Sequence, residues 1–150
     1  MELRKQLENT LYDAMRKKDD LLKNTIRMVL SAVKLSEVET GKLLDDPGIL
    51  SVLHKEVKIR KETITELADT DRSDLVAKAE VELKILESFL PAQATDEEIY
   101  QAARQVIRDT DSKSPSDMGK VMKQIIPLLA GKATPDRISA IVKALLSPAQ

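Results

Sequence analysis

Apolar residues recur three or four positions apart along most of the chain, which is the spacing of one face of an α-helix. In the first third of the chain, this spacing predicts one helix that ends near Lys18 and a second that ends near Gly41, a residue suited to a helix stop. The charged segment 16–20 between them predicts a solvated turn. The chain therefore begins with a tight helical hairpin.

The next two predicted helices are longer and form a second hairpin. Asp46 before Pro47 predicts the N-cap of a helix that runs to about Asp69, since Asp accepts hydrogen bonds from free N–H groups and Pro suits the first helical position. One member of its apolar stripe is charged, namely Arg60. Asp71 is expected to cap the fourth helix, and the short turn before it makes the two helices antiparallel.

A linker follows the fourth helix. Pro91 ends that helix, and Thr95 with Glu98 has the spacing of a capping box that opens the fifth. We therefore predict an N-terminal domain of about four helices over residues 1–94 and a C-terminal domain of three short helices over residues 95–150. Abundant helix formers and only four glycines favour an all-α fold, with a long-helix hairpin domain before a small three-helix domain.

Residues 114–133 have the most distinctive pattern. Ser114 followed by Pro115 predicts an N-cap and a first helical residue, and Pro127 is expected to end or kink the helix near Ile126 because Pro has no N–H to donate. Gly119 stands early in this helix, where Gly costs roughly 1 kcal/mol relative to Ala. Two interpretations of Gly119 stay open: close approach of a ligand backbone or phosphate, and close packing of two helices.

Composition excludes several classes of protein. The chain has no Cys, which excludes a disulfide framework and thiol catalysis, and its one His, His54, has no second His or Cys with which to hold zinc. The pairs Gly119–Lys120 and Gly131–Lys132 lack the earlier Gly and the following Ser or Thr of a phosphate-binding loop, so we reject nucleotide hydrolysis.

Carboxylates such as Glu80, Glu82 and Glu87 are expected to be solvated. We predict no catalytic residue, no metal and no cofactor.

The hydropathy of the chain indicates no membrane association. No apolar run approaches the roughly 18 residues of a membrane-spanning helix, and the N-terminal segment lacks the apolar core of a secretory signal. We therefore expect a soluble, cytoplasmic protein.

Charge is uneven along a chain whose net charge is −1. Residues 113–143 contain six basic and two acidic side chains, a local charge of +4, and both acids stand at predicted helix starts. Contact with phosphates explains this excess, and ordinary solvation of a mixed-charge face explains it equally well. The residues predicted to contact nucleic acid are Lys120, Lys123 and Lys132, with Arg137 and Lys143 in support and Gly119 and Gly131 allowing close approach.

The form of nucleic acid is also constrained. Tyr100 is the one aromatic residue of this half, so recognition of single strands by base stacking is not expected. Recognition of folded RNA through its shape and backbone fits better. A second basic cluster, around Arg60, is offset by Glu56, Glu62 and Glu66, and there the solvated face is the better interpretation.

Six motifs stand along the chain: TIRM at 25–28, EVKIRKET at 56–63, DRSDL at 71–75, FLPAQ at 89–93, DMGKVM at 117–122 and GKA at 131–133. In this order and at this spacing they resemble the GatB/YqeY family over nearly the whole chain, and the match is close to YqeY-type proteins. The chain departs from the family near Asp71 and Asp111, where members usually carry Gly, and at Thr134–Pro135, where many carry Asp-Gly.

The resemblance implies an all-helical fold and a C-terminal part similar to the tail domain of the B subunit of tRNA-dependent amidotransferase. That tail helps to hold tRNA, whereas the ligase chemistry belongs to a larger domain that this chain lacks. Three functions follow as hypotheses. The first is a non-catalytic, tRNA-binding accessory module, whose partners are tRNA and an amidotransferase or other tRNA-related protein. The second is a helical protein–protein adaptor, and the third a component of a glutamine-dependent carbon–nitrogen ligase.

Overall fold

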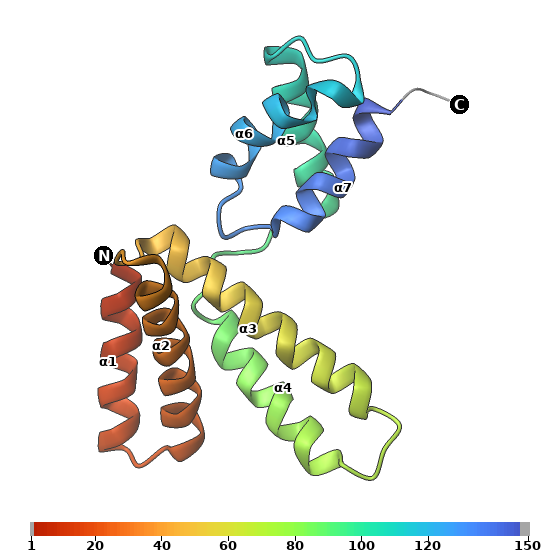
Figure 1. The fold of residues 1–150 in the computed structure, drawn as a ribbon. Helices are drawn as coiled ribbons and strands as arrows, with labels where there is room; N and C mark the ends of the chain where they lie inside the picture. The colour runs from red at the N-terminus through yellow and green to blue at the C-terminus, as the bar shows by residue number, and fades with distance from the viewer. Residues whose placement is uncertain (1, 148–150) are drawn as a thin grey trace. The chain divides into compact units, whose positions relative to one another are not determined.

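The computed structural model describes residues 2–147, which form seven α-helices, one short 3-10 helix and no strand (Figure 1). The predicted all-α class is confirmed. Contacts divide the chain into two compact units, Met1–Leu90 and Pro91–Gln150. This division lies four residues before the predicted boundary, because the segment after Pro91 bonds to the second unit. Gln93 Nε2 donates to the carbonyl of Gly131 (2.9 Å), and the Ala94 N–H donates to that of Lys132 (2.8 Å).

The first unit consists of two antiparallel hairpins, α1 with α2 and α3 with α4 (Figure 1). Their apolar stripes meet in one core that includes Leu7, Ile26, Leu53 and Leu86. Gly41 ends α2 in the left-handed region at φ 70°, as predicted, and its N–H donates to the Glu37 carbonyl. The four helices are α1 (Glu2–Arg16), α2 (Asp20–Thr40), α3 (Asp46–Leu67) and α4 (Ser73–Glu87).

Two predicted helix caps are wrong. The N-cap of α3 is Asp45, whose Oδ1 accepts from the Gly48 N–H at 3.0 Å. Asp46 is already helical, and its Oδ1 accepts instead from the Leu3 N–H at 3.3 Å, which ties the start of α1 to the start of α3. At α4 the N-cap is Arg72 rather than Asp71, and no side chain caps that helix.

The charged member of the α3 stripe, Arg60, is buried between two carboxylates. Its side chain is 6% exposed, its Nε lies 3.0 Å from Glu82 Oε2, and its Nη1 lies 3.2 Å from Glu56 Oε2. Its Nη2 lies 3.5 Å from the sulfur of Met28, so the guanidinium contacts α2, α3 and α4 together. The expectation that Glu82 is solvated is wrong, because α4 packs this side chain against α3 and leaves it 12% exposed.

Replacement of Arg60 by Met tests the importance of this ion network. We expect Arg60→Met to lower the free energy of unfolding by about 3 kcal/mol, because loss of one partner leaves buried charge uncompensated. Urea unfolding followed by circular dichroism measures the change. The control adds Glu56→Gln and Glu82→Gln and is expected to recover part of the loss. A control as unstable as the single variant would show that packing, rather than charge, sets the cost.

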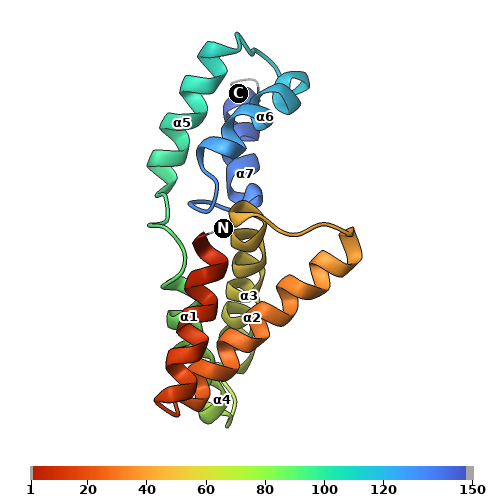
Figure 2. The same cartoon turned by 90° about the vertical axis from the view of Figure 1, so that its left-hand side faces the viewer.

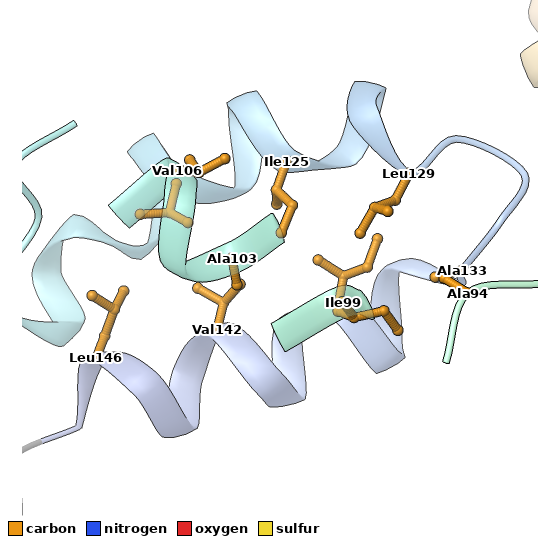
Figure 3. Close-up of a cluster of buried hydrophobic side chains, with 11 residues drawn as sticks. Ala94, Ile99, Ala103, Val106, Ile125, Leu129, Ala133, Val142 and Leu146 are labelled. Carbon is orange, nitrogen blue, oxygen red and sulfur yellow. The ribbon is translucent and has the colours of Figure 1, made fainter. Parts of the chain in front are cut away.

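The second unit packs three α-helices around a separate core (Figure 3). Ile99 and Ala103 of α5, Ile125 of α6 and Val142 of α7 point toward one another there. Thr95 and Glu98 form the predicted capping box. The elements are α5 (Asp96–Asp109), the 3-10 helix η1 (Pro115–Asp117), α6 (Met118–Leu128) and α7 (Pro135–Leu146).

The helix predicted from Pro115 to Ile126 differs at both ends. Its first turn is the 3-10 helix η1, and α6 begins at Met118. Pro127 lies inside α6, which continues to Leu128. The missing N–H falls within the last turn, and the Leu129 N–H closes the helix by donating to the carbonyls of Ile125 (3.2 Å) and Ile126 (3.3 Å).

Two left-handed residues shape the turns of the second unit. Gly131 follows α6 at φ 77°, which fits its predicted role as a helix stop. Asp111 adopts φ 51° after α5, a conformation that favours Gly. The departure of this chain from the family that it resembles, near Asp111, therefore falls at a left-handed position.

Candidate nucleic-acid interface

The exposed face of α6 carries two of the predicted basic residues. Val121 and Ile125 of this helix are buried in the core. Lys120 and Lys123 are exposed on the opposite side, and residues three apart on a helix are neighbours. No ion pair forms at the Lys123 side chain within the described part of the chain. The structure thus brings Lys120 and Lys123 together into one basic pair.

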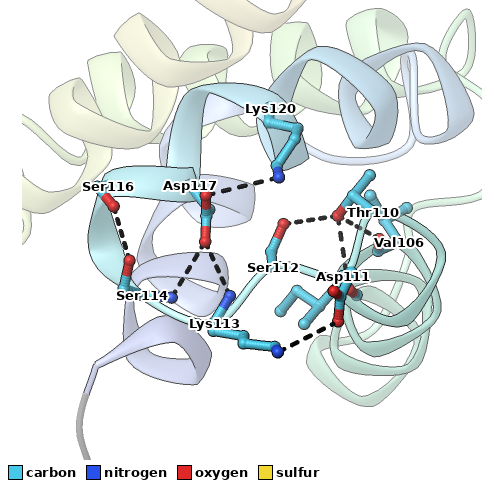
Figure 4. Close-up of polar contacts among 10 residues, drawn as sticks. Val106, Thr110, Asp111, Ser112, Lys113, Ser114, Ser116, Asp117 and Lys120 are labelled. Carbon is cyan, nitrogen blue, oxygen red and sulfur yellow. Dashed lines mark hydrogen bonds and ion pairs between the residues drawn. The ribbon is translucent and has the colours of Figure 1, made fainter.

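A polar network holds the start of α6 (Figure 4). The Asp117 carboxylate accepts hydrogen bonds from the backbone N–H groups of Lys113 (2.8 Å) and Ser114 (3.3 Å), and Lys120 Nζ lies 3.6 Å from its other oxygen. These two N–H donors, with the Lys120 ammonium, hold the pKa of Asp117 below its ordinary value. Because the carboxylate takes both N–H groups, an incoming phosphate has to be met by the lysine side chains.

The lowered pKa of Asp117 predicts a dependence of stability on pH. The stabilisation is complete above the unfolded-state pKa of about 4 and is lost as the pH falls through the lower folded-state pKa. We therefore expect the gap in melting temperature between the native protein and Asp117→Asn to be constant above about pH 5 and to shrink below pH 4. Thermal unfolding followed by circular dichroism between pH 3 and pH 7 checks this. A gap that widens on acidification would contradict it.

Lys132 and Arg137 lie beyond the other end of α6. An 11-residue α-helix is about 16 Å long, so Lys132, four residues after its last residue, does not share a face with Lys120. The guanidinium of Arg137 donates to the Ala94 carbonyl (3.0 Å) and to Asp96 Oδ1 (2.7 Å), which ties α7 to the start of α5. These contacts give Arg137 a structural role that the sequence did not indicate.

The charge balance of the folded second unit differs from the count along the chain. Residues 113–143 omit α5, whose first turn carries Asp96, Glu97 and Glu98, and Asp96 pairs with Arg137. The second unit as a whole contains eight basic and seven acidic residues, a net charge of +1. The basic character is therefore local to the exposed face of α6.

Lys143 lies on a different helix from the pair on α6. It is exposed on α7, six residues after Arg137, and this spacing places the two side chains on different sides of the helix. The five predicted basic residues therefore lie on α6, in the turn after it and on α7. Lys120 and Lys123 are the members that the structure brings together.

The two glycines differ in their surroundings. Gly131 is buried at φ 77°, so the turn itself accounts for this residue. Gly119 is exposed, and a Cβ added there would meet no atom within 4 Å. The interpretation of Gly119 as a site of close helix packing is therefore wrong, and close approach of a ligand stays a prediction.

Replacement of Gly119 by Ala separates stability from binding. We expect Gly119→Ala to raise the free energy of unfolding by about 0.5–1 kcal/mol, because Ala fits the open space and favours the helix. Urea unfolding measures this gain. If a ligand backbone lies against Gly119, the same variant binds that ligand more weakly although it is more stable. A loss of stability would show that the position is not open.

Other kinds of site have little support within residues 2–147. No group of three or more His, Cys, Asp or Glu side chains in this range is placed to share a metal ion. No helix in the same range is both long and apolar enough to cross a bilayer.

Comparison with known proteins identifies relatives over most of the chain. The family model described as "Yqey-like protein" matches residues 4–146. "Altered inheritance of mitochondria protein 41, mitochondrial" of Kluyveromyces lactis is 35% identical over 144 residues, covering 94% of this chain and 76% of that protein. The protein of the same name in Lachancea thermotolerans is 34% identical over 113 residues, covering 73% of this chain and 60% of the relative.

These relatives also bear on cellular location. A third protein of that name, from Vanderwaltozyma polyspora, is 32% identical over 110 residues, and all three are named as mitochondrial proteins. The expectation of a cytoplasmic protein is therefore wrong. Because a family model matches residues 4–146 and a relative is 35% identical over 94% of this chain, the chain belongs to the YqeY-like protein family.

Proposed function

We propose that this chain is a non-catalytic accessory module that contacts folded tRNA through the basic pair on α6. The observation that carries the proposal is the position of Lys120 and Lys123, exposed together on a helix face beside the open Gly119. The resemblance of the C-terminal part to the amidotransferase tail supports tRNA as the nucleic acid. An amidotransferase or other tRNA-related protein is the corresponding protein partner.

The chemistry of the face suits the phosphate backbone better than the bases. Lysine ammonium groups act as point charges toward phosphates and carry no sequence information by themselves. Tyr100, the one aromatic residue after residue 90, is only partly exposed, and the Arg104 guanidinium lies 5.5 Å from its ring centre. One face of the Tyr100 ring is therefore already occupied by that guanidinium. Binding is therefore expected to depend on salt and little on sequence.

Charge reversal on α6 tests the proposal. We expect Lys120→Glu/Lys123→Glu to weaken binding of bulk tRNA and to reduce the slope of log K against log salt by about one to two, because up to two phosphate contacts are lost. Fluorescence anisotropy at several salt concentrations measures both effects. Circular dichroism melts confirm that the variant is folded.

The chain supplies a matched control. Lys55 and Lys58 are also exposed, also three residues apart, and lie on α3 in the first unit. Lys55→Glu/Lys58→Glu changes the net charge by the same amount and should leave tRNA binding nearly unchanged. Equal losses in both variants would indicate a general charge effect and would contradict an interface on α6. Absence of tRNA binding by the native protein at low salt would refute the proposal.

A second candidate function, a protein–protein adaptor, is favoured by a separate observation on the first unit. Several large apolar side chains are exposed there, and three of them, Met28, Leu35 and Val38, belong to the single helix α2. Exposed apolar side chains gathered on one face indicate a contact with another molecule. This function does not compete with RNA binding for the same residues.

A further inference from the structure

The outer face of α2 carries a stripe of apolar side chains that its own unit leaves half or more exposed, although the sulfur of Met28 also contacts Arg60. Met28, Leu35 and Val38 are 50%, 60% and 71% exposed, and their spacing of seven and three places them along one side of the helix. The exposed Ser31 and the partly buried Ala32 lie between Met28 and Leu35, so small residues connect the larger ones. We call Met28, Ser31, Leu35 and Val38 the α2 stripe. The buried side of α2, which includes Ile26 and Val33, is a different face.

The α2 stripe is presented by a helix that is fixed at its C-terminal end. Glu37 accepts a hydrogen bond from the Leu44 N–H (2.7 Å) and forms an ion pair with Arg4 of α1. Gly41 closes the helix with its left-handed turn. Figure 2 shows the C-terminal half of α2 running outward from the other helices of the first unit. A partner helix can therefore lie along this face without displacing an element of the unit.

The two flanks of the stripe differ in charge. Arg27 and Lys34, which are seven residues apart and exposed, lie on one flank. Neither forms an ion pair within the described residues, although Lys34, after the Leu44 N–H and Arg4, contributes to the lowered pKa of Glu37. The opposite flank carries Glu39 near the C-terminal end. A partner helix that presents carboxylates toward Arg27 and Lys34 would satisfy both charges at the rim of an apolar contact.

A second copy of this chain and a membrane surface both fit the α2 stripe less well than an acidic helix does. A symmetric antiparallel pairing of two α2 helices would set the row of Arg27 and Lys34 against the same row of the second copy, where like charges repel. Helices that bind membrane surfaces carry basic residues along the polar face and aromatic residues at the apolar boundary. On α2 the basic residues flank one side only, Glu39 lies on the other, and the helix contains no aromatic residue.

We propose that the α2 stripe docks an acidic amphipathic helix of a partner protein, whose apolar side chains cover Met28, Leu35 and Val38 and whose carboxylates meet Arg27 and Lys34. The proposal rests on the adaptor function and is independent of RNA binding by the second unit. Recognition of this kind reads apolar anchors at helical spacing, and the flanking charges select the partner.

Two designed peptides test the proposal with the full chain. Both are alanine-rich helices of about 18 residues with leucines spaced to match the stripe, and they differ only in carrying Glu or Lys on the flank. Fluorescence anisotropy of labelled peptide measures binding. We expect the native chain to bind the acidic peptide at least about tenfold more tightly than the basic one, and Arg27→Glu/Lys34→Glu to reverse this preference. Leu35→Ser/Val38→Ser is expected to weaken binding of the acidic peptide about tenfold or more.

Each remaining outcome contradicts the proposal in a different way. Equal binding of both peptides would show that charge does not select the partner, although the adaptor function would stand. Binding of neither peptide would refute the stripe as a docking face. If the native chain self-associates and Leu35→Ser/Val38→Ser abolishes the association, the stripe binds a second copy of the chain. If the native chain sediments with anionic vesicles and the same variant does not, the stripe binds a membrane surface. Binding of tRNA by these variants, measured in parallel, reports separately on the α6 proposal.

Discussion

An α-helix buries one stripe of its surface and leaves the rest to solvent, and the two units of this chain depend on that constraint. Each unit gathers the inner stripes of its helices into a separate core, one around Leu7 and Ile26 and the other around Ile99 and Ile125. The outward faces are then free to differ from one another. On α6 the outward face is basic, and on α2 it is apolar. Both functional proposals concern residues that the cores do not use.

Arg60 is the exception to this arrangement, because a charged side chain occupies a position of the inner stripe. Its guanidinium is held by Glu56 and Glu82, which are themselves poorly exposed. A buried ion network contributes less to stability than its number of contacts implies, because all three groups lose solvation. It does restrict how α2, α3 and α4 pack, since other arrangements would leave a buried charge without a partner. Two of the family motifs, at 25–28 and 56–63, meet at this point through Met28 and Arg60.

The sequence predicted the helices well because the spacing of apolar residues is a local signal. It predicted the N-cap residues less well where two adjacent residues are equally suited to the N-cap position. Asp45 and Asp46 both suit an N-cap; Asp45 caps the helix, and Asp46 accepts instead from the N–H of Leu3, which is 43 residues away. Glu82 was misjudged for the same reason, since its partner Arg60 lies on another helix. The charge count over residues 113–143 missed Asp96, which folding places against Arg137. In each case a contact between elements distant in the sequence decides the outcome.

The exposed Gly119 has a practical consequence for studying the protein in solution. The chain contains no cysteine, so a thiol introduced at this position would be unique, and the surrounding space leaves room for an attached dye. The label would stand on the outward face of α6, one residue from Lys120. Changes in its emission would report directly on whatever approaches this helix, without a reporter on the partner. The same feature that leaves Gly119 without packing neighbours thus makes it a suitable site for spectroscopy.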